Sequence, residues 1–367
     1  MMSPRQTILE HPRRSISSRH AVSASVFEWM SEMKAIMQRG RQGSGALFPL
    51  QNRFGYLRRS VTEPAPFLVL TGPTAAGKTE IATEVARRLG AEILCMDSMT
   101  VYRGMDIGTA KPSPSERAVV PHHLLDLVDP REEFDTARWC RAAEEVSSGL
   151  LARGGTPLFV GGTPLYLMAF FKGMMAAPAA DPELRARIEA REDAEPGVLH
   201  RELSRADPAA ARRIHWKDRR RLVRALEVIE RTGTPISEQQ SHFERPGWAR
   251  PCRILALFRD REELHRRVKR RTEKMLEAGL LDEVRSILDR GGFSRTAAAA
   301  IGYAESLDYL RGRYKDLEEL RNKIRRHTHR LIRRQTTWLR RLEGVRWLCA
   351  DATPEAVIEA LCCDRPS

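Results

Sequence analysis

The chain has 367 residues and a formal net charge of +14, with 62 Lys and Arg against 48 Asp and Glu. This length can bury a sizeable core in one large domain or two modest ones. No run of about 18 apolar residues is present, so we expect neither a membrane-spanning helix nor a membrane partner. The positive charge favours a polyanionic partner, with nucleic acid as the first candidate, although a basic protein without such a partner has the same composition.

Residues 1–65 differ in composition from the rest of the chain. The first 66 residues hold 10 Lys and Arg against 4 Asp and Glu, with many serines and little periodicity. An Arg- and Ser-rich start is typical of an organelle transit peptide, but Glu10, Glu28 and Glu32 argue against one. We expect a basic, disordered extension or a start codon placed too far upstream, and the sequence leaves both open. The six scattered cysteines form no readable zinc site or disulfide framework and suit a reducing cytoplasm, where we expect the protein to act.

Ordered elements begin at about Pro66. The apolar run 67–70 leads into glycine and predicts a buried strand. Apolar residues then recur at helical spacing from Ile81 to Leu89, and Gly90 ends the helix. Further strands are predicted at 93–96, 157–160 and 254–258. Residues from 181 to about 240 contain no strand-like run, and the chain is again helical from about 259 to 341.

Strands that alternate with helices predict an α/β fold, in which a parallel sheet is flanked by helices on both faces. The core would be built from residues 66–180 and 250–350. Residues 181–249 would form an inserted all-helical subdomain, and residues 351–367 a C-terminal tail.

The segment between the first predicted strand and the first predicted helix is here called the phosphate loop. Its sequence is Gly72-Pro73-Thr74-Ala75-Ala76-Gly77-Lys78-Thr79. The pattern G-x-x-x-x-G-K-[ST] in that context predicts a site for a di- or triphosphate and a P-loop NTPase-like core, although a turn that binds nothing is the alternative. Backbone N–H groups would converge on phosphate oxygens, helped by the partial charge of the helix N-terminus. Lys78 would contact the terminal phosphate, and the Thr79 hydroxyl would bind Mg²⁺.

Asp97 follows the second predicted strand, at the edge of the sheet where ligands bind in such folds. Its carboxylate could hold Mg²⁺, accept a proton from a nucleophile or only cap the next turn. Because most proteins with such a loop cleave ATP or GTP, nucleoside triphosphate chemistry is the first expectation at this point.

A series of longer motifs changes this expectation. They are Asp97-Ser98-Met99-Thr100-Val101-Tyr102, 104–112, 122–126, 160–166, 181–185, 221–227, Gly302-Tyr303 and 334–340. In order and spacing these motifs resemble the tRNA dimethylallyltransferases, the IPP transferase family. The resemblance covers roughly Phe67 to Leu348 and is to the bacterial type, because the zinc finger of some eukaryotic relatives is missing.

The resemblance implies transfer of a dimethylallyl group from dimethylallyl diphosphate to the exocyclic amine of the tRNA adenosine immediately 3′ of the anticodon. The phosphate loop would then hold a diphosphate leaving group in place of ATP, stabilised by Lys78 and Mg²⁺. Asp97 would accept the proton of the amine. Arg271 aligns with an arginine that reaches the diphosphate, although its basic neighbours also suit a solvated helix face.

The resemblance also assigns tRNA contacts to Asp97, Ser98, Met99, Thr100, Thr163 and Arg185. The last two match positions that contact the reacting nucleotide or the diphosphate in the family. The family commonly has Gln where this chain has Thr100 and, near Gly302, Ala299. These two differences bear on anticodon-loop selectivity and not on the reaction. Lys111 could touch phosphate or face solvent, and both remain open.

Two basic helices are the candidate tRNA surface, although a solvated helix face is the alternative for each. In the first, an apolar face runs from Leu222 to Ile229 and arginines gather beside it. The second runs from 311 to 346 and holds 13 Lys and Arg against 4 Asp and Glu. Gln335 falls on its apolar stripe, where either a base edge or an internal hydrogen bond would satisfy the amide. We expect tRNA contacts from Arg220, Arg221, Leu222, Val223, Arg224 and Gln335.

Three other functions share parts of this pattern. An ATP-dependent kinase of small metabolites would have the same core without an RNA partner. An enzyme that prenylates free adenosine phosphates would share the phosphate loop and Asp97 but would not need the basic helices. Intact Lys78, Thr79 and Asp97 disfavour a non-catalytic RNA-binding protein with a decayed loop. For the favoured enzyme we expect Mg²⁺ as the cofactor and a monomer that binds tRNA and dimethylallyl diphosphate.

Overall fold

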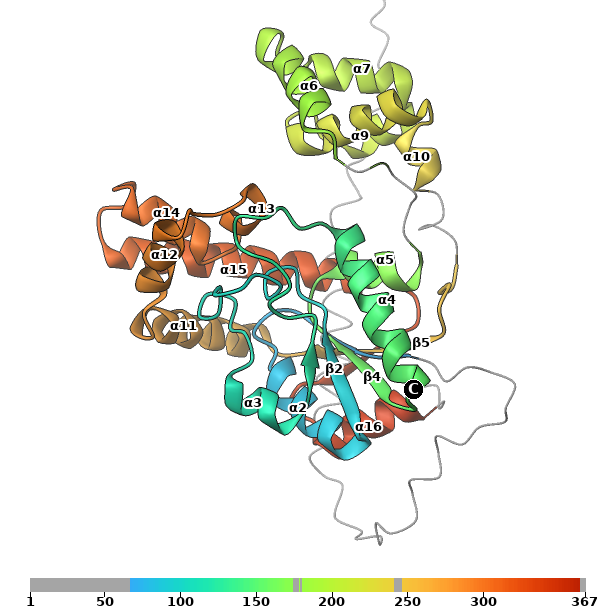
Figure 1. Cartoon of the computed structure of the whole chain (residues 1–367), viewed down its shortest axis with the longest axis vertical. Helices are drawn as coiled ribbons and strands as arrows, with labels where there is room; N and C mark the ends of the chain where they lie inside the picture. The colour runs from blue at the N-terminus through green and yellow to red at the C-terminus, as the bar shows by residue number, and fades with distance from the viewer. Residues whose placement is uncertain (1–66, 174–177, 179, 241–245, 364–367) are drawn as a thin grey trace, which may run out of the picture. The chain divides into compact units, whose positions relative to one another are not determined.

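A computed structural model describes residues 67–173, 178, 180–240 and 246–363 (Figure 1). The extension predicted at residues 1–65 lies outside the described residues. In the described part of the chain, no helix is long and apolar enough to cross a membrane.

Parallel strands form one sheet in the order β3-β2-β4-β1-β5-β6. They are β1 (Phe67–Thr71), β2 (Ala91–Cys95), β3 (His122–His123), β4 (Thr156–Val160), β5 (Cys252–Phe258) and β6 (Val345–Cys349). The four strands predicted from the sequence are all present. The sequence does not predict β3, which has two residues, or the edge strand β6, in which none of the five residues is fully buried.

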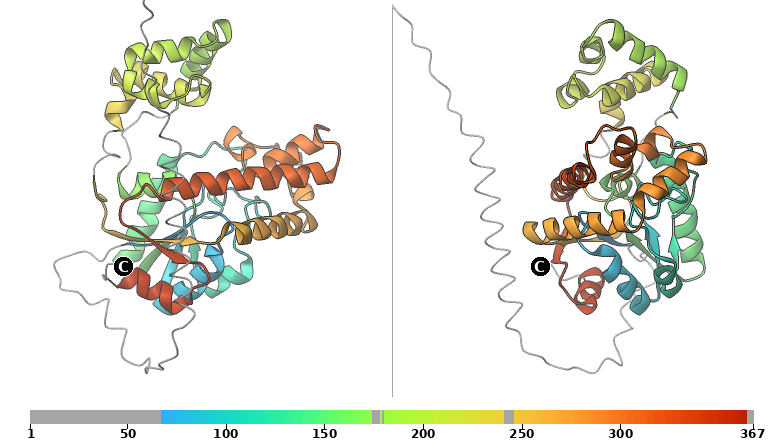
Figure 2. Two further views of the ribbon diagram at one scale, coloured as in Figure 1. Left: turned by 180° about the vertical axis from the view of Figure 1, so that it is seen from behind. Right: turned by 90° about the vertical axis from the view of Figure 1, so that its left-hand side faces the viewer.

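Alternate residues of the central strands bury the two faces of the sheet. Val69 of β1 joins one hydrophobic cluster with Phe159 of β4, whereas Leu68 and Leu70 of β1 join the other. Helices α4 (Thr136–Ala152) and α5 (Pro164–Phe171) cover the first face, and α2 (Lys78–Leu89) and α16 (Pro354–Cys362) cover the second (Figures 1 and 2). The segment that the sequence analysis sets apart as a tail therefore contains a helix that packs on the core.

The chain after β5 is helical, as the sequence predicts. It forms α11 (Arg261–Glu277), α12 (Leu280–Asp289), α13 (Arg295–Ala298), α14 (Tyr303–Leu310) and α15 (Leu317–Leu339), while the short α3 (Pro114–Val119) precedes β3. Helices α11 and α15 pack side by side (Figure 2). Ile332 of α15 lies against Leu264 and Val268 of α11, which brings the C-terminal half of α15 close to the phosphate loop residue Ala75.

Residues 180–240 form a separate group of helices, here called the helical insertion. They are α6 (Pro182–Ala194), α7 (Val198–Ala206), α8 (Pro208–Arg213), α9 (Arg219–Thr232) and α10 (Ile236–Gln239). The side chains of Asp181, Asp207 and Asp218 cap the N-termini of α6, α8 and α9. Apolar residues of these helices, such as Ile188 and Leu222, form a hydrophobic cluster that belongs to the insertion alone.

Glu227 is a fully buried carboxylate that joins α6 to α9. The Arg185 guanidinium donates two hydrogen bonds to it at 2.9 Å each, and Arg224 donates one at 2.5 Å. The backbone N–H of Asp181 donates another at 2.8 Å. Burial alone would raise the pKa of Glu227, but these bonds hold the pKa below its ordinary value. Glu227 is therefore the charged centre of the insertion.

We predict that Glu227→Ala destabilises the helical insertion by about 3–5 kcal/mol, because two partly buried arginines lose their shared carboxylate. Glu230→Ala on the same helix is the matched control, since Glu230 forms an exposed pair with Arg191 that is worth less than about 1 kcal/mol. Amide hydrogen exchange of residues 180–240 in increasing urea measures both free energies. Equal losses in the two variants would contradict the prediction.

Candidate active site

A cavity of about 1060 Å³ lies at the carboxyl ends of β1, β2 and β4. The phosphate loop follows β1, Asp97 follows β2, and Gly161 and Gly162 follow β4, and all contribute to the cavity wall. Arg267 and Arg271 of α11 complete it. Ligands of open parallel sheets bind at this edge, and the candidate catalytic residues of the sequence analysis meet here.

The backbone of the phosphate loop needs small residues. Gly72 has a φ of 137°, and a Cβ there would lie 2.5 Å from the carbonyl oxygen of Leu257. Gly77 has a φ of 95° and immediately precedes the 12-residue helix α2. Ala75 has a φ of 65°, a left-handed conformation that is unfavourable for a residue other than glycine. The loop thereby places the N-terminus of α2 at the cavity, where its partial positive charge favours an anion.

Two arginines from outside the phosphate loop hold its carbonyl groups. Arg259, just after β5, donates from Nε to the carbonyl oxygen of Ala76 at 2.8 Å. Arg267 of α11 donates from Nε to the carbonyl oxygen of Ala75 at 2.9 Å. No local sequence pattern singles out Arg259 or Arg267, because 183 and 192 residues separate them from the groups that they bind.

Gln335 of α15 lies inside the protein, with 6% of its surface exposed. Its Oε1 accepts a hydrogen bond from the backbone N–H of Thr74 at 2.8 Å, and its Nε2 donates to the carbonyl oxygen of Gly162 at 2.6 Å. The structure therefore favours the internal hydrogen bond over the tRNA contact predicted for this residue. The amide ties the phosphate loop to the segment that follows β4.

Lys78 begins α2 and folds back over the phosphate loop. Its Nζ donates to the carbonyl oxygens of Gly72 and Pro73 at 3.0 and 2.9 Å. Burial lowers the pKa of Lys78 to about 8, an effect that the Asp97 carboxylate opposes and the Arg271 guanidinium reinforces. An anion in the cavity would restore the charge of this ammonium group, so the site is electrostatically suited to phosphate.

Asp97 uses part of its carboxylate within the chain. Its Oδ1 accepts the backbone N–H of Met99 at 2.8 Å, so the turn cap considered in the sequence analysis does form. Its Oδ2 has no hydrogen-bond donor among the described residues, and the side chain lines the cavity. The backbone N–H of Ser98 donates to Thr163 Oγ1 at 3.2 Å, which places Thr163, the residue before α5, beside this segment. One carboxylate oxygen thus remains for chemistry.

Arg271 lies on α11 and lines the same cavity. Its Nη1 donates to Thr74 Oγ1 at 3.2 Å and its Nη2 to the carbonyl oxygen of Thr109 at 3.3 Å. Burial lowers the pKa of Arg271, while Asp97 raises it. No carboxylate of the described residues forms an ion pair with Arg271. Its position therefore fits an anion-binding role better than the solvated helix face considered as the alternative.

Three more residues singled out in the sequence are accounted for here. Met99 is partly buried against the first hydrophobic cluster. Thr100 is buried and lines the cavity, and its Oγ1 has no hydrogen-bond partner among the described residues. Lys111 is also buried, and its Nζ donates to the carbonyl oxygen of Tyr102 at 2.7 Å and to Asp126 at 2.6 Å. Lys111 therefore neither faces solvent nor is free to bind phosphate, because its charge is neutralised within the chain.

In the helical insertion, the predicted tRNA contacts divide by burial. Arg220 and Arg221 are exposed on α9. Leu222 and Val223 are buried in the core of the insertion, so their side chains do not offer the tRNA contact predicted for them. They lie on the apolar face of an amphipathic helix, which the spacing of apolar residues already indicates.

Arg185 and Arg224 are the two arginines that bind Glu227, as described above. Arg224 also donates to the carbonyl oxygen of Pro178 at 3.0 Å. Neither is among the residues that line the cavity at the phosphate loop.

Comparisons with known proteins agree with this geometry. The family model described as IPP transferase matches residues 100–342, and a second, described as isopentenyl transferase, matches residues 66–125. A relative from Desulforudis audaxviator named tRNA dimethylallyltransferase is 46% identical over 78% of this chain and 93% of its own length. The chain belongs to the IPP transferase family.

Two solved structures show the same relationship. The tRNA isopentenylpyrophosphate transferase of Bacillus halodurans is 37% identical, with a TM-score of 0.59 over 81% of this chain and 94% of that one. A eukaryotic dimethylallyltransferase acting on tRNA is 26% identical, with a TM-score of 0.66 over 81% of this chain and 76% of that one. These neighbours confirm the P-loop NTPase-like fold. Family membership also makes the chain a prenyltransferase, which sets aside the metabolite kinase and the non-catalytic RNA-binding protein.

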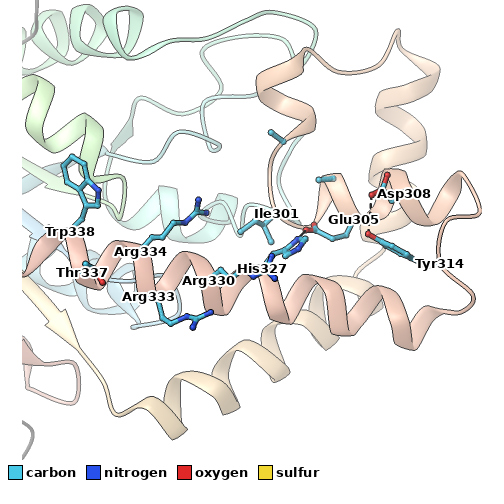
Figure 3. Close-up of a pocket in the computed structure, with 12 residues that line it drawn as sticks. Ile301, Glu305, Asp308, Tyr314, His327, Arg330, Arg333, Arg334, Thr337 and Trp338 are labelled. Atoms are coloured by element: carbon cyan, nitrogen blue, oxygen red, sulfur yellow. Dashed lines mark hydrogen bonds and ion pairs between the residues drawn. The ribbon is translucent and has the colours of Figure 1, made fainter. Parts of the chain in front are cut away.

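A second cavity of this IPP transferase, about 830 Å³ in volume, lies along α14 and α15 and is here called the α15 groove (Figure 3). Arg330, Arg333 and Arg334 of α15 line it. Glu305 of α14 is buried and bonds to Nδ1 of His327 in the same groove. The groove combines positive charge with a polar pair, and its arginines belong to the helix that carries Gln335.

We predict that inorganic diphosphate binds this IPP transferase up to about tenfold more weakly at about pH 9 than at about pH 7. Lys78 is protonated below its pKa of about 8, so the phosphate loop loses one positive charge as the pH rises through that value. Titration calorimetry at both pH values measures the change.

Lys78→Arg is the control, because arginine keeps its charge over this range and the ionisation of diphosphate affects both proteins alike. The same pH dependence in the two proteins would show that Lys78 is not the titrating group.

Proposed function

We propose that this IPP transferase moves the dimethylallyl group of dimethylallyl diphosphate to the exocyclic amine of the tRNA adenosine immediately 3′ of the anticodon. The observation that carries the proposal is the shared cavity, in which the Asp97 carboxylate lies close enough to Lys78 and Arg271 to oppose the lowering of their pKa by burial. The cavity thereby combines an anion site with a carboxylate. The relatives of this chain have names that state action on tRNA.

The donor diphosphate would occupy the phosphate loop. Its N–H groups, Lys78 and Arg271 would stabilise the negative charge that develops on the leaving diphosphate as the bond between carbon and oxygen breaks. The loop and α11 supply these groups in a fixed arrangement, so little reorganisation is needed at the moment of reaction.

Mg²⁺ fits the donor side of the cavity. Thr79 lines the cavity at the start of α2, and its hydroxyl is an oxygen donor of the kind that this hard cation prefers beside phosphate oxygens. In the described part of the chain, no group of three His, Cys, Asp or Glu side chains could hold a metal ion by itself. Thr79 would therefore hold the ion together with the diphosphate, whose charge Mg²⁺ would neutralise during bond cleavage.

Asp97 would act as the general base. The lone pair of an adenine amine is delocalised into the ring, so the amine becomes a competent nucleophile only as its proton leaves. As the new bond between nitrogen and carbon forms, the proton would pass to the free Oδ2 of Asp97 while diphosphate departs. Thr163 and Ser98 would position this carboxylate through the hydrogen bond that joins them.

The acceptor tRNA would be bound by positive surface outside the donor cavity. Arg220 and Arg221 of the helical insertion are exposed, and the arginines of the α15 groove offer a second contact. Arg185 and Arg224 would support the first surface indirectly, since Glu227 fixes both. The target adenosine would have to leave its stack to reach Asp97, as in other enzymes that modify bases. With tRNA as the acceptor, the reaction would take place in the cytoplasm.

In the direct test, the full chain is incubated with Mg²⁺ and labelled dimethylallyl diphosphate. The acceptor is unmodified tRNA or AMP, or is left out. We expect label in tRNA only. Label in AMP at a comparable rate would instead support an enzyme of free adenosine phosphates.

We predict that Asp97→Asn lowers kcat about 10²- to 10⁴-fold, because the amide cannot accept the proton. The affinities for tRNA and for inorganic diphosphate should stay within about threefold, since the change is nearly isosteric. Glu80→Gln, at the rim of the same cavity, is the control for loss of one negative charge. A kcat of Asp97→Asn close to that of the control would remove Asp97 as the base.

We predict that replacing both Arg220 and Arg221 by alanine weakens tRNA binding. The negative slope of log affinity against log salt concentration should become shallower by about 1–2. Fluorescence anisotropy over a salt series measures this slope. Arg285→Ala, which removes an exposed arginine of α12, is the control. An unchanged slope in the double variant would exclude this face of α9 from the tRNA interface.

A further inference from the structure

Gln335 makes contacts that suit a role in the donor site. It belongs to the basic helix α15, yet its amide contacts the backbone on two sides of the donor cavity, Thr74 in the phosphate loop and Gly162 after β4. Close approach is possible only because residue 162 is glycine, since a Cβ there would lie 2.7 Å from Gln335 Nε2. A buried amide with both ends bound across 261 and 173 residues of sequence fixes two chain segments relative to each other.

The segment that Gln335 holds contains the strained residue of the loop. Ala75 follows Thr74 directly, and its φ of 65° is a conformation that L-residues other than glycine adopt only when their surroundings impose it. Arg267 holds the carbonyl oxygen of Ala75 on one side, and Gln335 holds the N–H of Thr74 on the other. Arg271 adds a bond to the Thr74 hydroxyl. The strained peptide units thus have fixed partners at both ends.

These bonds all come from groups of the chain itself. A loop whose N–H groups are already directed at the phosphate site loses less conformational freedom when the donor binds, so more of the interaction energy appears as affinity. A loop free to relax at Ala75 would first have to recover this conformation.

We propose that Gln335 is a positioning residue of the donor site, which holds the phosphate loop in its phosphate-binding conformation through Thr74. The inference rests on the proposed function, because it takes the diphosphate of the prenyl donor as the ligand. It assigns Gln335 to the donor and not to tRNA, and it makes α15 a helix with two roles, since Arg330, Arg333 and Arg334 line the α15 groove while Gln335 supports the loop.

The test compares Gln335→Met, which fills the same space without the amide, with the wild-type full chain. We expect the Kd of inorganic diphosphate and the KM of dimethylallyl diphosphate to rise about tenfold, the loss expected for one buried hydrogen bond. The KM of tRNA should stay within about twofold. Asn322→Leu, which removes an exposed amide from the same helix, is the control and should change neither.

Rescue by glycine separates positioning from simple core packing. Glycine adopts a φ of 65° without steric cost, so Ala75→Gly should recover most of the donor affinity in the Gln335→Met background. If Gln335 only stabilised the fold, Ala75→Gly would not restore donor affinity. Should Gln335→Met fail to fold, Gln335→Asn keeps a polar amide but is one methylene too short to reach both Thr74 and Gly162, and the same results are expected from it.

The outcomes distinguish this inference from the proposed function. A wild-type chain that binds diphosphate and transfers the prenyl group, with unchanged donor KM in the Gln335 variants, would overturn the positioning role alone. A rise confined to the KM of tRNA would return Gln335 to the RNA interface and overturn it as well. A wild-type chain that binds no diphosphate would overturn both the role of Gln335 and the proposed function.

Discussion

The N–H groups of the phosphate loop can converge on an anion only if the loop adopts backbone conformations that are intrinsically unfavourable. The rest of this structure depends on the contacts that hold the loop in these conformations. The phosphate loop contains a left-handed alanine and a glycine packed against the carbonyl of Leu257. Arg259 and Arg267 bind its carbonyl groups, and Gln335 binds one of its N–H groups. Side chains from the segment after β5, from α11 and from α15 thus hold the loop.

The same arrangement determines the chemistry that the cavity supports. Lys78 and Arg271 are partly buried positive groups beside the Asp97 carboxylate, and burial lowers the pKa of both cations. An incoming diphosphate would supply the missing negative charge, whereas a neutral ligand would leave the burial of these cations uncompensated. Asp97 lies within electrostatic range of the cations and keeps one oxygen without a donor among the described residues, so the site can stabilise a leaving anion and accept a proton at once.

Local sequence signals predicted the structural features that are determined by residues close to one another in the chain. Apolar runs located the four central strands, and glycine spacing located the phosphate loop, because strand and loop geometry are set within a few residues. The partners of Gln335, which the apolar stripe did single out, and the role of Arg259 were beyond such reasoning, since the groups that they bind are 261 and 183 residues away. The apolar stripe that buries Leu222 was visible in the sequence, but motif likeness alone cannot separate a residue that touches tRNA from one that supports its neighbours.

The most direct test of this account is to identify the phosphorus-containing product that forms in the absence of ATP. The full chain is incubated with dimethylallyl diphosphate, unmodified tRNA and Mg²⁺, and phosphorus NMR compares released diphosphate with the prenyl groups found in tRNA. The account predicts one intact diphosphate for each group transferred. Release of orthophosphate, or transfer that occurs only when ATP is added, would contradict the claim that the phosphate loop holds the leaving group of the prenyl donor.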